Sequence, residues 1–477
     1  MPDEPITLDR LATIGRGTVI GDAGTVVGDV THDSRAAGPD DLFVAIRGAH
    51  RDGHEFVTST SAGAACVDAP LEVPIPLLVV PDTRAALPWL AAEVHGHPSR
   101  RLQVVGVTGT NGKTTVAHMV AAIVEAAGQS AGVIGTIGAR IGPDRIHLER
   151  TSPEASDFQR LLRRMVDAGV GTAAVEVSSH ALEFGRVDAT EYAVVAFTNL
   201  SQDHLDLHGD MESYFLTKAS LFLGTDAAAV VNVDDPWGAR LVTMLDRPVV
   251  AVGTDGDYRV EDLDLGLTES RFVLSTPSGR EHVRIPLGGR FNVENALVAA
   301  ACAGSLGLEV ADMAAGLGAV ELIPGRMEPV DVGQQPAILV DYAHTPEGID
   351  QVLESVRPHT AGRITVVVGA GGDRDADKRS DMGRAATRAD RVVFTSDNPR
   401  SEDPGAIIEA LLAGADGPAE ILVEPDRRLA IERAIREAGP GDVVLILGKG
   451  HEPGQEIAGR VLPFDDRQVA REAVTAR

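Results

Sequence analysis

The 477-residue sequence predicts an α/β protein built from three domains in series. A domain usually takes up about 100–200 residues, so this chain is too long for one hydrophobic core. Two long stretches alternate continuous apolar strands with amphipathic helices, which is typical of parallel sheets covered on both faces. A glycine-rich turn joins a strand to a helix at the start of the first such stretch, an arrangement typical of phosphate-binding domains.

The first domain is expected to span residues 1–98, where short strands and turns alternate with short helical stretches. A polar and basic connector at residues 95–101 ends it. The second domain is expected over residues 99–325 and the third over residues 326–477. The reason is that the alternation of strands and helices stops and then restarts after a turn at residues 323–326.

The second domain is expected to contain a parallel sheet with an antiparallel sheet beside it. Its first strand, at residues 102–107, leads through the glycine-rich turn into a helix at residues 114–128. An amphipathic pattern at residues 157–169 predicts another helix. Further strands are expected at residues 131–137, 172–178, 192–199 and 227–234. Residues 257–287 alternate polar and apolar side chains instead, which predicts antiparallel strands.

The third domain is expected to have the strand–helix rhythm of a dinucleotide-binding fold. Its apolar strands are expected at residues 338–344, 363–370, 391–398, 419–425 and 443–450. Polar motifs follow three of these strands: GDRD at 372–375, DNPR at 397–400 and GKGHE at 448–452. Ligands of such sheets bind at the carboxyl ends of the strands, so these motifs are candidate binding residues.

Charge and composition exclude several classes of partner. The formal net charge of −27 repels nucleic-acid phosphates and anionic membrane surfaces, so neither is expected as a partner. An anionic substrate would then need a local cationic pocket. Cys66 and Cys302 lie in apolar, alanine-rich contexts, as expected of buried thiols in a reducing compartment. No secretion-signal pattern and no apolar run of about 20 residues is found, so a cytoplasmic location is expected.

Lysine is scarce in this sequence. Of its 43 basic side chains only four are lysines, namely Lys113, Lys218, Lys378 and Lys449. The chain uses arginine wherever a general surface cation suffices, so a retained lysine is a candidate for a position that requires an amine. Chance retention is the alternative for each of them.

The motif GTNGKTT predicts a phosphate-binding loop. Glycines allow backbone amides to turn inward around phosphates, Lys113 reaches the outer phosphates, and the Thr114 hydroxyl suits a magnesium ion. The general pattern has a glycine where this chain has Val107, with Gly106 one residue earlier, and an ordinary glycine-rich turn is the alternative. The residues expected at the phosphates are Gly109, Thr110, Asn111, Gly112, Lys113, Thr114 and Thr115.

Two further motifs follow neighbouring strands and suggest a metal site. EVSSHAL contains Glu176, and NLSQDHLDLHGD contains His204. The spacing alone is equally compatible with a structural role, because histidine is an unusual magnesium ligand. Lys218 lies on the next helix. A neutral lysine can add carbon dioxide to become an anionic carbamate, but the residues alone favour a simple salt bridge here.

Three shorter motifs surround the end of the second domain, and each is weak by itself. GRFNVENAL supplies Asn292 and Asn295, GRME supplies Arg326, and DYAHTPE supplies Asp341. A carboxylate at a strand end suits ribose hydroxyls, whereas an arginine suits a nucleotide phosphate or base.

Together these motifs resemble the Mur ligase family over residues 102–453. The shared motifs, in the family's order, are GTNGKTT, EVSSHAL, NLSQDHLDLHGD, Lys218, GRFNVENA, GRME and DYAHTPE. The segment THDSRAAGPDDLFVAIRG is similar to the UDP-binding segment of the member that adds the third peptide residue. The resemblance implies a small UDP-binding α/β domain, a central P-loop ATPase domain, and a Rossmann-like C-terminal domain that binds an amino acid.

The resemblance also implies a role for each motif residue. Lys113 and Thr114 would hold the ATP phosphates and a magnesium ion. A second magnesium ion would be held by Glu176, His204 and Lys218 as the carbamate, N6-carboxylysine. The residues expected to be catalytic are Lys113, Glu176, His204 and Lys218. The adenosine would be framed by Asn292, Asn295, Arg326 and Asp341. The UDP-substrate would be contacted by Ser34, Arg35, Thr151, Ser152, Ser178 and Arg186. Phe184 replaces a residue that is polar in some relatives, so that contact is not carried over.

The implied reaction is ATP-dependent amide formation in cytoplasmic peptidoglycan precursor synthesis. The D-glutamyl carboxylate of UDP-N-acetylmuramoyl-L-alanyl-D-glutamate attacks the γ-phosphate of ATP to give an acyl phosphate. The incoming amine then displaces phosphate. Two Mg²⁺ ions, Lys113 and backbone amides would offset the gathering of negative charge. We expect a monomer.

The incoming amino acid is expected to be meso-diaminopimelate, which differs from lysine by a carboxylate beside its distal ammonium. Recognising both groups requires a cationic fork and an acid in the third domain. The residues expected there are Arg374, Asp397, Asn398, Arg400, Gly448 and Glu452. The alternatives are the lysine-adding member of the family, a folylpolyglutamate synthase-like ligase and, from another class, a nucleotide-binding switch without ligase activity.

Overall fold

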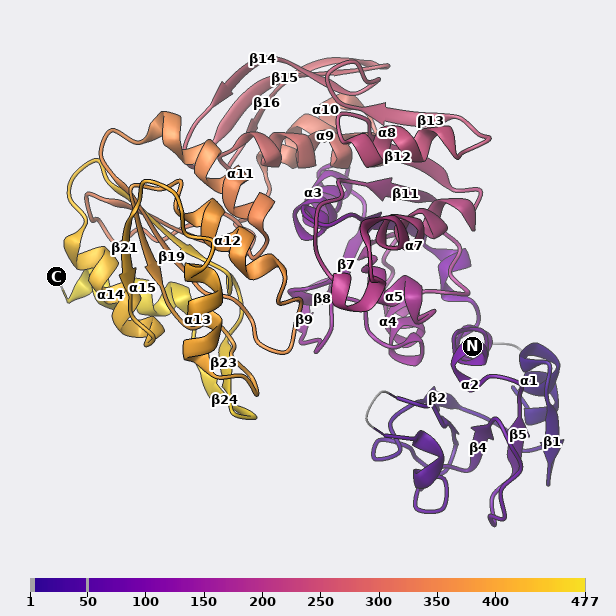
Figure 1. The fold of residues 1–477 in the computed structure, drawn as a ribbon. Coiled ribbons are helices and arrows are strands. Elements are labelled where there is room, and N and C mark those ends of the chain that lie inside the picture. Colours follow the sequence, from indigo (N-terminus) through magenta and orange to yellow (C-terminus); the bar gives the residue numbers. More distant parts are fainter. Residues whose placement is uncertain (1–4, 49–50, 477) are drawn as a thin grey trace.

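The computed structural model describes residues 5–48 and 51–476. Figure 1 shows the N-terminal domain at one end of the molecule, a central domain in the middle and the C-terminal domain at the other end. Each domain has its own β-sheet, so the predicted three-domain α/β class is confirmed. The exact boundaries at residues 98 and 325 remain predictions. The sequence predicts no secretion signal at the N-terminus, and residues 1–4 of that segment lie outside the described residues.

The N-terminal domain is a sheet of short strands packed against two helices. The strand order is β1-β5-β4-β3-β2, in which β2 to β5 are parallel and β1 is antiparallel to β5. The strands are β1 (Thr18–Ile20), β2 (Asp29–Thr31), β3 (Asp41–Val44), β4 (Ala64–Val67) and β5 (Leu77–Val79). The helices are α1 (Leu8–Gly15) and α2 (Thr83–Val94), with 3-10 turns at Gly53–Phe56 and Pro98–Arg101. Leucines of both helices fill the core above the sheet.

The central domain has a sheet with the order β13-β12-β11-β6-β10-β7-β8-β9. The strands β13 to β7 in this order are parallel, as predicted. The strands β8 and β9 were not predicted and continue the sheet in antiparallel fashion. Their bounds are β6 (Gln103–Thr108), β7 (Ala131–Gly135), β8 (Gly138–Ile141), β9 (Asp144–Ile146), β10 (Thr172–Glu176), β11 (Val194–Phe197), β12 (Ala228–Asn232) and β13 (Val249–Val252).

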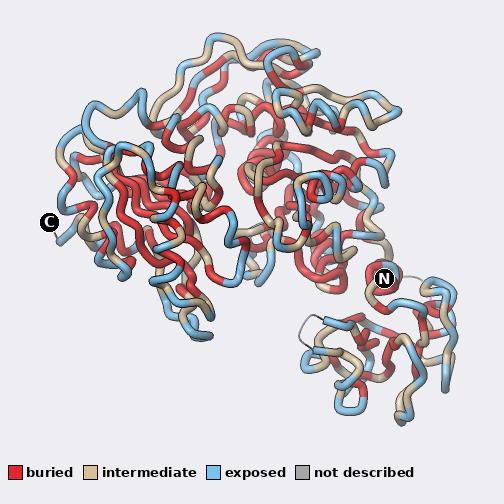
Figure 2. The backbone as a smooth tube through the Cα atoms, viewed as in Figure 1, coloured by how far each residue is buried: buried red, intermediate tan, exposed pale blue. Residues whose placement is uncertain are grey.

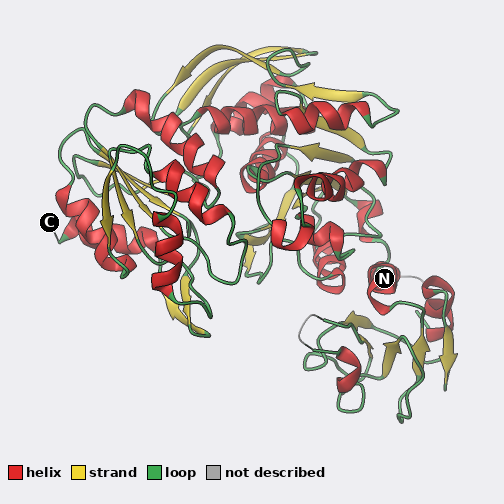
Figure 3. Ribbon diagram, viewed as in Figure 1, coloured by secondary structure: helices red, strands yellow, loops and turns green. Residues whose placement is uncertain are grey.

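Helices cover both faces of the central sheet (Figure 3). They are α3 (Lys113–Ala126), α4 (Ala155–Asp167), α5 (Ser179–Glu183), α6 (Leu205–His208), α7 (Met211–Leu223), α8 (Pro236–Thr243), α9 (Arg290–Ser305) and α10 (Val310–Gly318). Successive strand residues enter opposite cores: Val105 of β6 packs with α3 and α9, whereas Val104 packs with Phe158 of α4. Because both faces are buried, the inner parallel strands are mostly apolar, and Figure 2 shows them largely in the colour of buried residues.

The predicted antiparallel side sheet is present, with the order β14-β15-β16. Its strands are β14 (Arg259–Leu265), β15 (Ser270–Thr276) and β16 (Gly279–Ile285). Phe272, Leu274 and Ile285 point into the same core as α9 and α10. The side sheet therefore covers one helical layer of the central domain and leaves the phosphate-loop end of the main sheet open.

The C-terminal sheet has the order β17-β18-β22-β19-β20-β21. All neighbours are parallel except the unpredicted short edge strand β17. The strands are β17 (Glu328–Pro329), β18 (Ala337–Asp341), β19 (Ile364–Val368), β20 (Arg391–Phe394), β21 (Glu420–Val423) and β22 (Val443–Leu447), with a further hairpin of β23 (Gly454–Ile457) and β24 (Arg460–Pro463). The helices are α11 (Pro346–Val356), α12 (Lys378–Ala386), α13 (Pro404–Leu412), α14 (Arg427–Glu437) and α15 (Asp466–Thr475), with a 3-10 turn at Arg357–His359.

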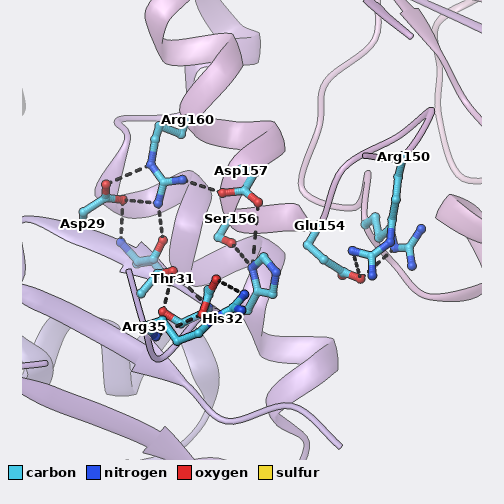
Figure 4. Close-up of polar contacts among 12 residues, drawn as sticks. Asp29, Thr31, His32, Arg35, Arg150, Glu154, Ser156, Asp157 and Arg160 are labelled. Carbon is cyan, nitrogen blue, oxygen red and sulfur yellow. Dashed lines mark hydrogen bonds and ion pairs between the residues drawn. The ribbon is translucent and has the colours of Figure 1, made fainter. Parts of the chain in front are cut away.

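Polar contacts join the N-terminal domain to α4 of the central domain (Figure 4). Arg160 donates two hydrogen bonds to the Asp29 carboxylate, at 2.9 and 3.1 Å, and a third to the Val30 carbonyl. His32 Nδ1 lies 3.0 Å from Ser156 Oγ. Among the described residues, no helix is both long and apolar enough to cross a membrane.

Candidate active site between the central and C-terminal domains

A cavity of about 940 Å³ lies where the carboxyl ends of the central and C-terminal strands face each other. It brings together most residues predicted from the motifs, although they come from distant parts of the chain. The predicted residues that line it are Thr110, Asn111, Gly112, Lys113, Thr114, Thr115, Thr151, Ser152, Glu176, Ser178, Arg186, His204, Asn292, Asn295, Arg326, Asp341, Arg374, Asp397, Asn398, Arg400, Gly448 and Glu452. Four predicted residues do not line it, namely Ser34, Arg35, Gly109 and Lys218.

The phosphate-binding loop connects β6 to α3, as the sequence predicts. Gly112 precedes α3 with a φ of 86°, and a Cβ at this position would collide with Asn295 Oδ1. The position therefore requires glycine. Lys113 Nζ folds over the loop and donates to the carbonyls of Gly109 and Thr110 at 2.9 and 2.8 Å. The amide groups at the start of α3 face the cavity and favour an anion there.

Hard oxygen ligands lie directly beside this loop. Thr114 Oγ1 donates to Glu176 Oε2 at 3.0 Å, and Glu176 also accepts from the amide and hydroxyl of Thr136. Arg326, at the start of the C-terminal domain, donates to Thr114 Oγ1 at 2.9 Å. A hydroxyl and a carboxylate next to a phosphate loop are the ligand types that Mg²⁺ prefers, so these residues fit the ion.

His204 lies at the rim of the same cavity with a φ of 56°. Its ring centroid is 4.8 Å from that of His180, and its Nε2 lies 3.4 Å from Asp203 Oδ2. Burial lowers the pKa of His204 to about 3, so its imidazole is neutral and able to bind a metal. Among the described residues, no group of three His, Cys, Asp or Glu side chains is arranged to hold a metal ion.

Lys218 lies on α7 beneath the phosphate loop, with only 1 % of its surface exposed. Its Nζ donates to the Gly109 carbonyl at 2.9 Å and lies 4.6 Å from the Tyr214 ring centroid. Within the described chain it has no ion-pair partner, so the salt bridge favoured by the residues alone is not formed. Burial, and then the charge of Lys113, hold the pKa of Lys218 well below its usual value.

The residues predicted around the adenosine line the same cavity as the phosphate loop. Asn292 Nδ2 donates to the Gly288 carbonyl at 2.7 Å, and its Oδ1 is buried without a hydrogen-bond partner. Asp341 accepts from the amides of Met327 and Ala343, and burial raises its pKa. The Arg326 guanidinium lies 4.6 Å from the Tyr342 ring centroid.

The residues predicted for the UDP-substrate fall into two groups. Ser152 Oγ donates to the Glu176 carbonyl at 2.8 Å, and Arg186 pairs with Glu154 at 3.0 Å. Ser152 and Arg186 line the cavity together with Thr151 and Ser178; Ser152 Oγ also donates to Ser178 Oγ at 3.2 Å, and Thr151 Oγ1 lies 3.0 Å from Thr136 Oγ1. By contrast, Ser34 and Arg35 lie after β2 in the N-terminal domain, where the 88 % exposed Arg35 pairs with Asp33 (Figure 4).

The C-terminal strand ends bring the predicted amino-acid site together. Asn398 Nδ2 donates to Glu452 Oε2 at 2.7 Å, and Arg400 donates to the Gly372 carbonyl at 2.6 Å. Gly448 has a φ of 109°, and a Cβ there would collide with the Asp397 carboxylate. Arg374 lies on the same wall of the cavity without a hydrogen bond or ion pair among the described residues.

Three charged residues of this region were not predicted as site residues. Asp203 is buried and accepts from Lys378 of the C-terminal domain at 2.8 Å, and His344 Nε2 lies 3.6 Å away. Burial opposes its ionisation, but His344, His204 and Lys378 together hold the pKa of Asp203 well below its usual range.

Lys449 contacts Asn398 and Glu452. The scarcity of lysine had already marked Lys378 and Lys449 as candidate functional positions, but no motif assigned them to this site.

The fold and the cavity define a class of protein: a multidomain α/β protein in which a glycine-rich strand-to-helix loop of the central domain and the strand ends of the C-terminal domain line one cavity. Two family models match the chain, the Mur ligase middle domain over residues 107–303 and the Mur ligase, glutamate ligase domain over residues 325–450. The chain belongs to the Mur ligase family.

Individual relatives support this assignment. The chain is 46 % identical to "UDP-N-acetylmuramoyl-L-alanyl-D-glutamate--2,6-diaminopimelate ligase" of Streptomyces coelicolor, over 96 % of this chain and 94 % of that protein. A protein of the same name from Geobacillus thermodenitrificans is 44 % identical, over 93 % of this chain and 94 % of that protein. A solved structure of that name has a TM-score of 0.68 at 31 % identity and covers 99 % of both chains. The folylpolyglutamate synthase of Mycobacterium tuberculosis shares the fold, with a TM-score of 0.62 at 22 % identity over 77 % of this chain and 92 % of that one.

Proposed function

We propose that this chain is an ATP-dependent ligase that joins meso-diaminopimelate to UDP-N-acetylmuramoyl-L-alanyl-D-glutamate through an acyl phosphate. The observation that carries the proposal is the single cavity, which is lined on one side by a phosphate loop and on the other by arginines and acids. The names of relatives more than 40 % identical over nearly the whole chain support the substrates.

In the first step a D-glutamyl carboxylate oxygen bonds to the γ-phosphorus of ATP, and ADP leaves. Lys113 Nζ exchanges its contacts with the loop carbonyls for phosphate oxygens, because the amine lies directly above the loop. Asn292, Asn295, Arg326 and Asp341 hold the adenosine in this assignment. The orphaned Asn292 Oδ1 offers the nucleotide a buried acceptor.

Magnesium bound at this site would neutralise charge on the phosphate oxygens and on the acyl phosphate. Thr114 is assigned to one ion, and Glu176, His204 and the Lys218 carbamate to a second. The lowered pKa of Lys218 supports the carbamate, because only the neutral amine attacks carbon dioxide. Its nitrogen bonds to the carbon, one proton leaves, and the product is an anionic carboxylate instead of a buried cation.

In the second step the amine of meso-diaminopimelate attacks the acyl carbon, phosphate leaves and the amine loses a proton. We assign its distal carboxylate to Arg374 and Arg400, and its distal ammonium to Asp397 and Glu452, beside Asn398 and Gly448. The UDP-sugar extends along Thr151, Ser152, Ser178 and Arg186 toward Ser34 and Arg35 in the N-terminal domain. We further propose a cytoplasmic monomer.

Two alternatives within the family use the same phosphate chemistry. A lysine-adding ligase has no need of a carboxylate-binding fork, so Arg374 and Arg400 favour diaminopimelate. A folylpolyglutamate synthase shares the fold but has no evident use for the N-terminal sheet that carries Ser34 and Arg35.

Steady-state ADP release tests the proposal. Release should require both UDP-N-acetylmuramoyl-L-alanyl-D-glutamate and meso-diaminopimelate, and mass spectrometry should identify the tripeptide product. Two comparisons are made: lysine in place of meso-diaminopimelate, and tetrahydrofolate with glutamate in place of both substrates. Faster turnover with lysine would select the first alternative, and turnover with the folate pair would select the second. ATP binding without turnover on any pair would indicate a nucleotide-binding switch.

A further inference from the structure

The GKGHE turn buries a lysine completely at the amino-acid end of the cavity. Lys449 has no exposed surface, although an unpaired buried ammonium is strongly unfavourable. Its Nζ donates to Asn398 Oδ1 and to Glu452 Oε2, both at 3.0 Å, and lies 4.0 Å from Asp397 Oδ1. Lys449 therefore contacts three residues assigned to the amino-acid site without lining the cavity itself.

The contacts of Lys449 fix which hydrogen-bonding groups of Asn398 stay free. A carbonyl oxygen has two lone pairs, and Asn398 Oδ1 already accepts from Lys449 Nζ and from the Glu456 amide at 2.9 Å. The Asn398 amino group gives one of its two N–H donors to Glu452 Oε2. What remains for a ligand is one N–H, so Asn398 can bind a carboxylate but cannot accept from an ammonium.

The same lysine restricts Glu452 and the charge around it. Glu452 Oε2 accepts from both Lys449 and Asn398, which leaves Oε1 as the oxygen available to a ligand. Lys449 also offsets one of the two negative charges of Asp397 and Glu452. Asp397, Glu452 and Lys449 together then carry one net negative charge. This charge balances one ligand ammonium, while the arginines bind the neighbouring ligand carboxylate.

We propose that Lys449 is a positioning residue that sets the specificity of this site for an amino acid whose end group carries both an ammonium and a carboxylate. It orients Asn398 as a donor, directs Oε1 of Glu452 toward the ammonium, and keeps the pocket from becoming acidic enough to prefer a lone ammonium. This inference rests on the proposed function.

The test replaces Lys449 and measures all three substrates. Lys449→Met keeps the length of the side chain without its charge or donors, whereas Lys449→Gln removes the charge and keeps an N–H donor. In both variants the KM for meso-diaminopimelate should rise at least about tenfold, with a smaller change in kcat. The ratio of kcat/KM for meso-diaminopimelate over lysine should fall at least about tenfold, and the KM values for ATP and the UDP-substrate should stay within about twofold.

Two controls separate positioning from general damage. Lys449→Arg keeps a buried cation and should retain more of the selectivity than Lys449→Gln. The exposed Arg436→Met, in the same domain, should change neither KM nor selectivity. If methionine prevents folding, as judged by thermal melting, the glutamine variant decides the outcome, because it preserves a hydrogen bond to the cluster.

The outcomes distinguish this inference from the proposed function. Wild-type protein that fails to use meso-diaminopimelate refutes the proposed function. Wild-type protein that uses it, with unchanged selectivity in a folded Lys449→Gln variant, overturns the inference alone. A uniform rise in all three KM values would also overturn it, because it would show a structural role only.

Discussion

Lys218 and Lys449 are both completely buried, but their surroundings are opposite. Lys218 donates only to the Gly109 carbonyl, stands near Lys113 and has no carboxylate within ion-pair distance among the described residues. Lys449 donates to a carboxylate and to an amide oxygen that a second donor also holds. Burial without a nearby anion lowers the pKa of Lys218, whereas Lys449 has a carboxylate and an amide oxygen as fixed hydrogen-bond acceptors.

The difference assigns the two lysines to different tasks. A neutral amine is a nucleophile and can be modified, so Lys218 suits covalent chemistry at the phosphate-loop end of the cavity. A paired ammonium is a fixed donor, so Lys449 suits recognition at the other end. The following predictions test this comparison, in order of decreasing effect.

The largest effect is expected from Lys218→Ala. Under the proposed assignment of the Lys218 carbamate to a magnesium ion, the change should reduce ligation at least about a thousandfold, because a lost metal contact withdraws several kcal/mol of transition-state stabilisation. Acetate, which fits the space left by the carbamate, should restore part of the activity. The assay is ADP release with and without acetate, with Lys218→Arg as the control that acetate should not rescue. Full activity of Lys218→Ala would refute the role.

Lys113→Ala should reduce acyl-phosphate formation roughly a hundredfold to a thousandfold, since its amine stabilises charge on the transferred phosphoryl group. Binding of the UDP-substrate should change little, because its assigned contacts lie elsewhere in the cavity. Rapid-quench measurement of acyl phosphate and calorimetry of the UDP-substrate test the two parts. A large loss of UDP-substrate affinity would contradict the assignment of Lys113 to ATP.

Arg400→Ala tests the recognition end of the comparison. Losing a charge-assisted contact worth about 1.5–3 kcal/mol should raise the KM for meso-diaminopimelate roughly tenfold to a hundredfold. The KM for lysine should change less, because lysine has no distal carboxylate. Phosphate release at varied amino-acid concentration gives both values, and Arg436→Ala serves as the exposed control. Equal effects on both amino acids would contradict the carboxylate contact.

The smallest effect is expected on stability, at the partly exposed ion pair between Asp29 and Arg160, in contrast to the two buried lysines. Asp29→Asn at the contact with Arg160 should lower the free energy of unfolding by about 1 kcal/mol at pH 7. Burial opposes ionisation of Asp29, but the nearby His95 ring, 3.2 Å away, and the hydrogen bonds from Arg160 outweigh it and lower the pKa of Asp29.

The sign of the pH dependence follows from this lowered pKa. The stabilisation is complete above the ordinary value of 3.8 and is lost as the pH falls below it. Urea unfolding at pH 7, 5 and 3 should therefore show a constant difference between wild type and Asp29→Asn that shrinks at the lowest pH. Asp33→Asn, whose partner Arg35 is a neighbour in sequence, is the control with a smaller expected effect. A difference that grows toward pH 3 would contradict the assignment.

The sequence by itself determined the α/β class, the central parallel strands, the antiparallel side sheet and the phosphate loop. These features depend on local patterns: a strand buried on both faces is apolar at every position, and Gly112 is required by its own backbone conformation. The motif residues could be assigned to strand ends for the same reason. The strands β8 and β9 could not be recognised, because both are short and β9 is largely exposed.

Only the tertiary structure decided which charged groups meet. Lys449 is separated from Asn398 by 51 positions, and Lys378 from Asp203 by 175, so no periodicity in the sequence links the members of either pair. The structure also showed that Lys218 lacks the salt bridge the residues alone favoured, and that Ser34 and Arg35 lie away from the cavity. Local patterns reflect which face of an element is buried, whereas the partner of a buried charge depends on how the domains pack.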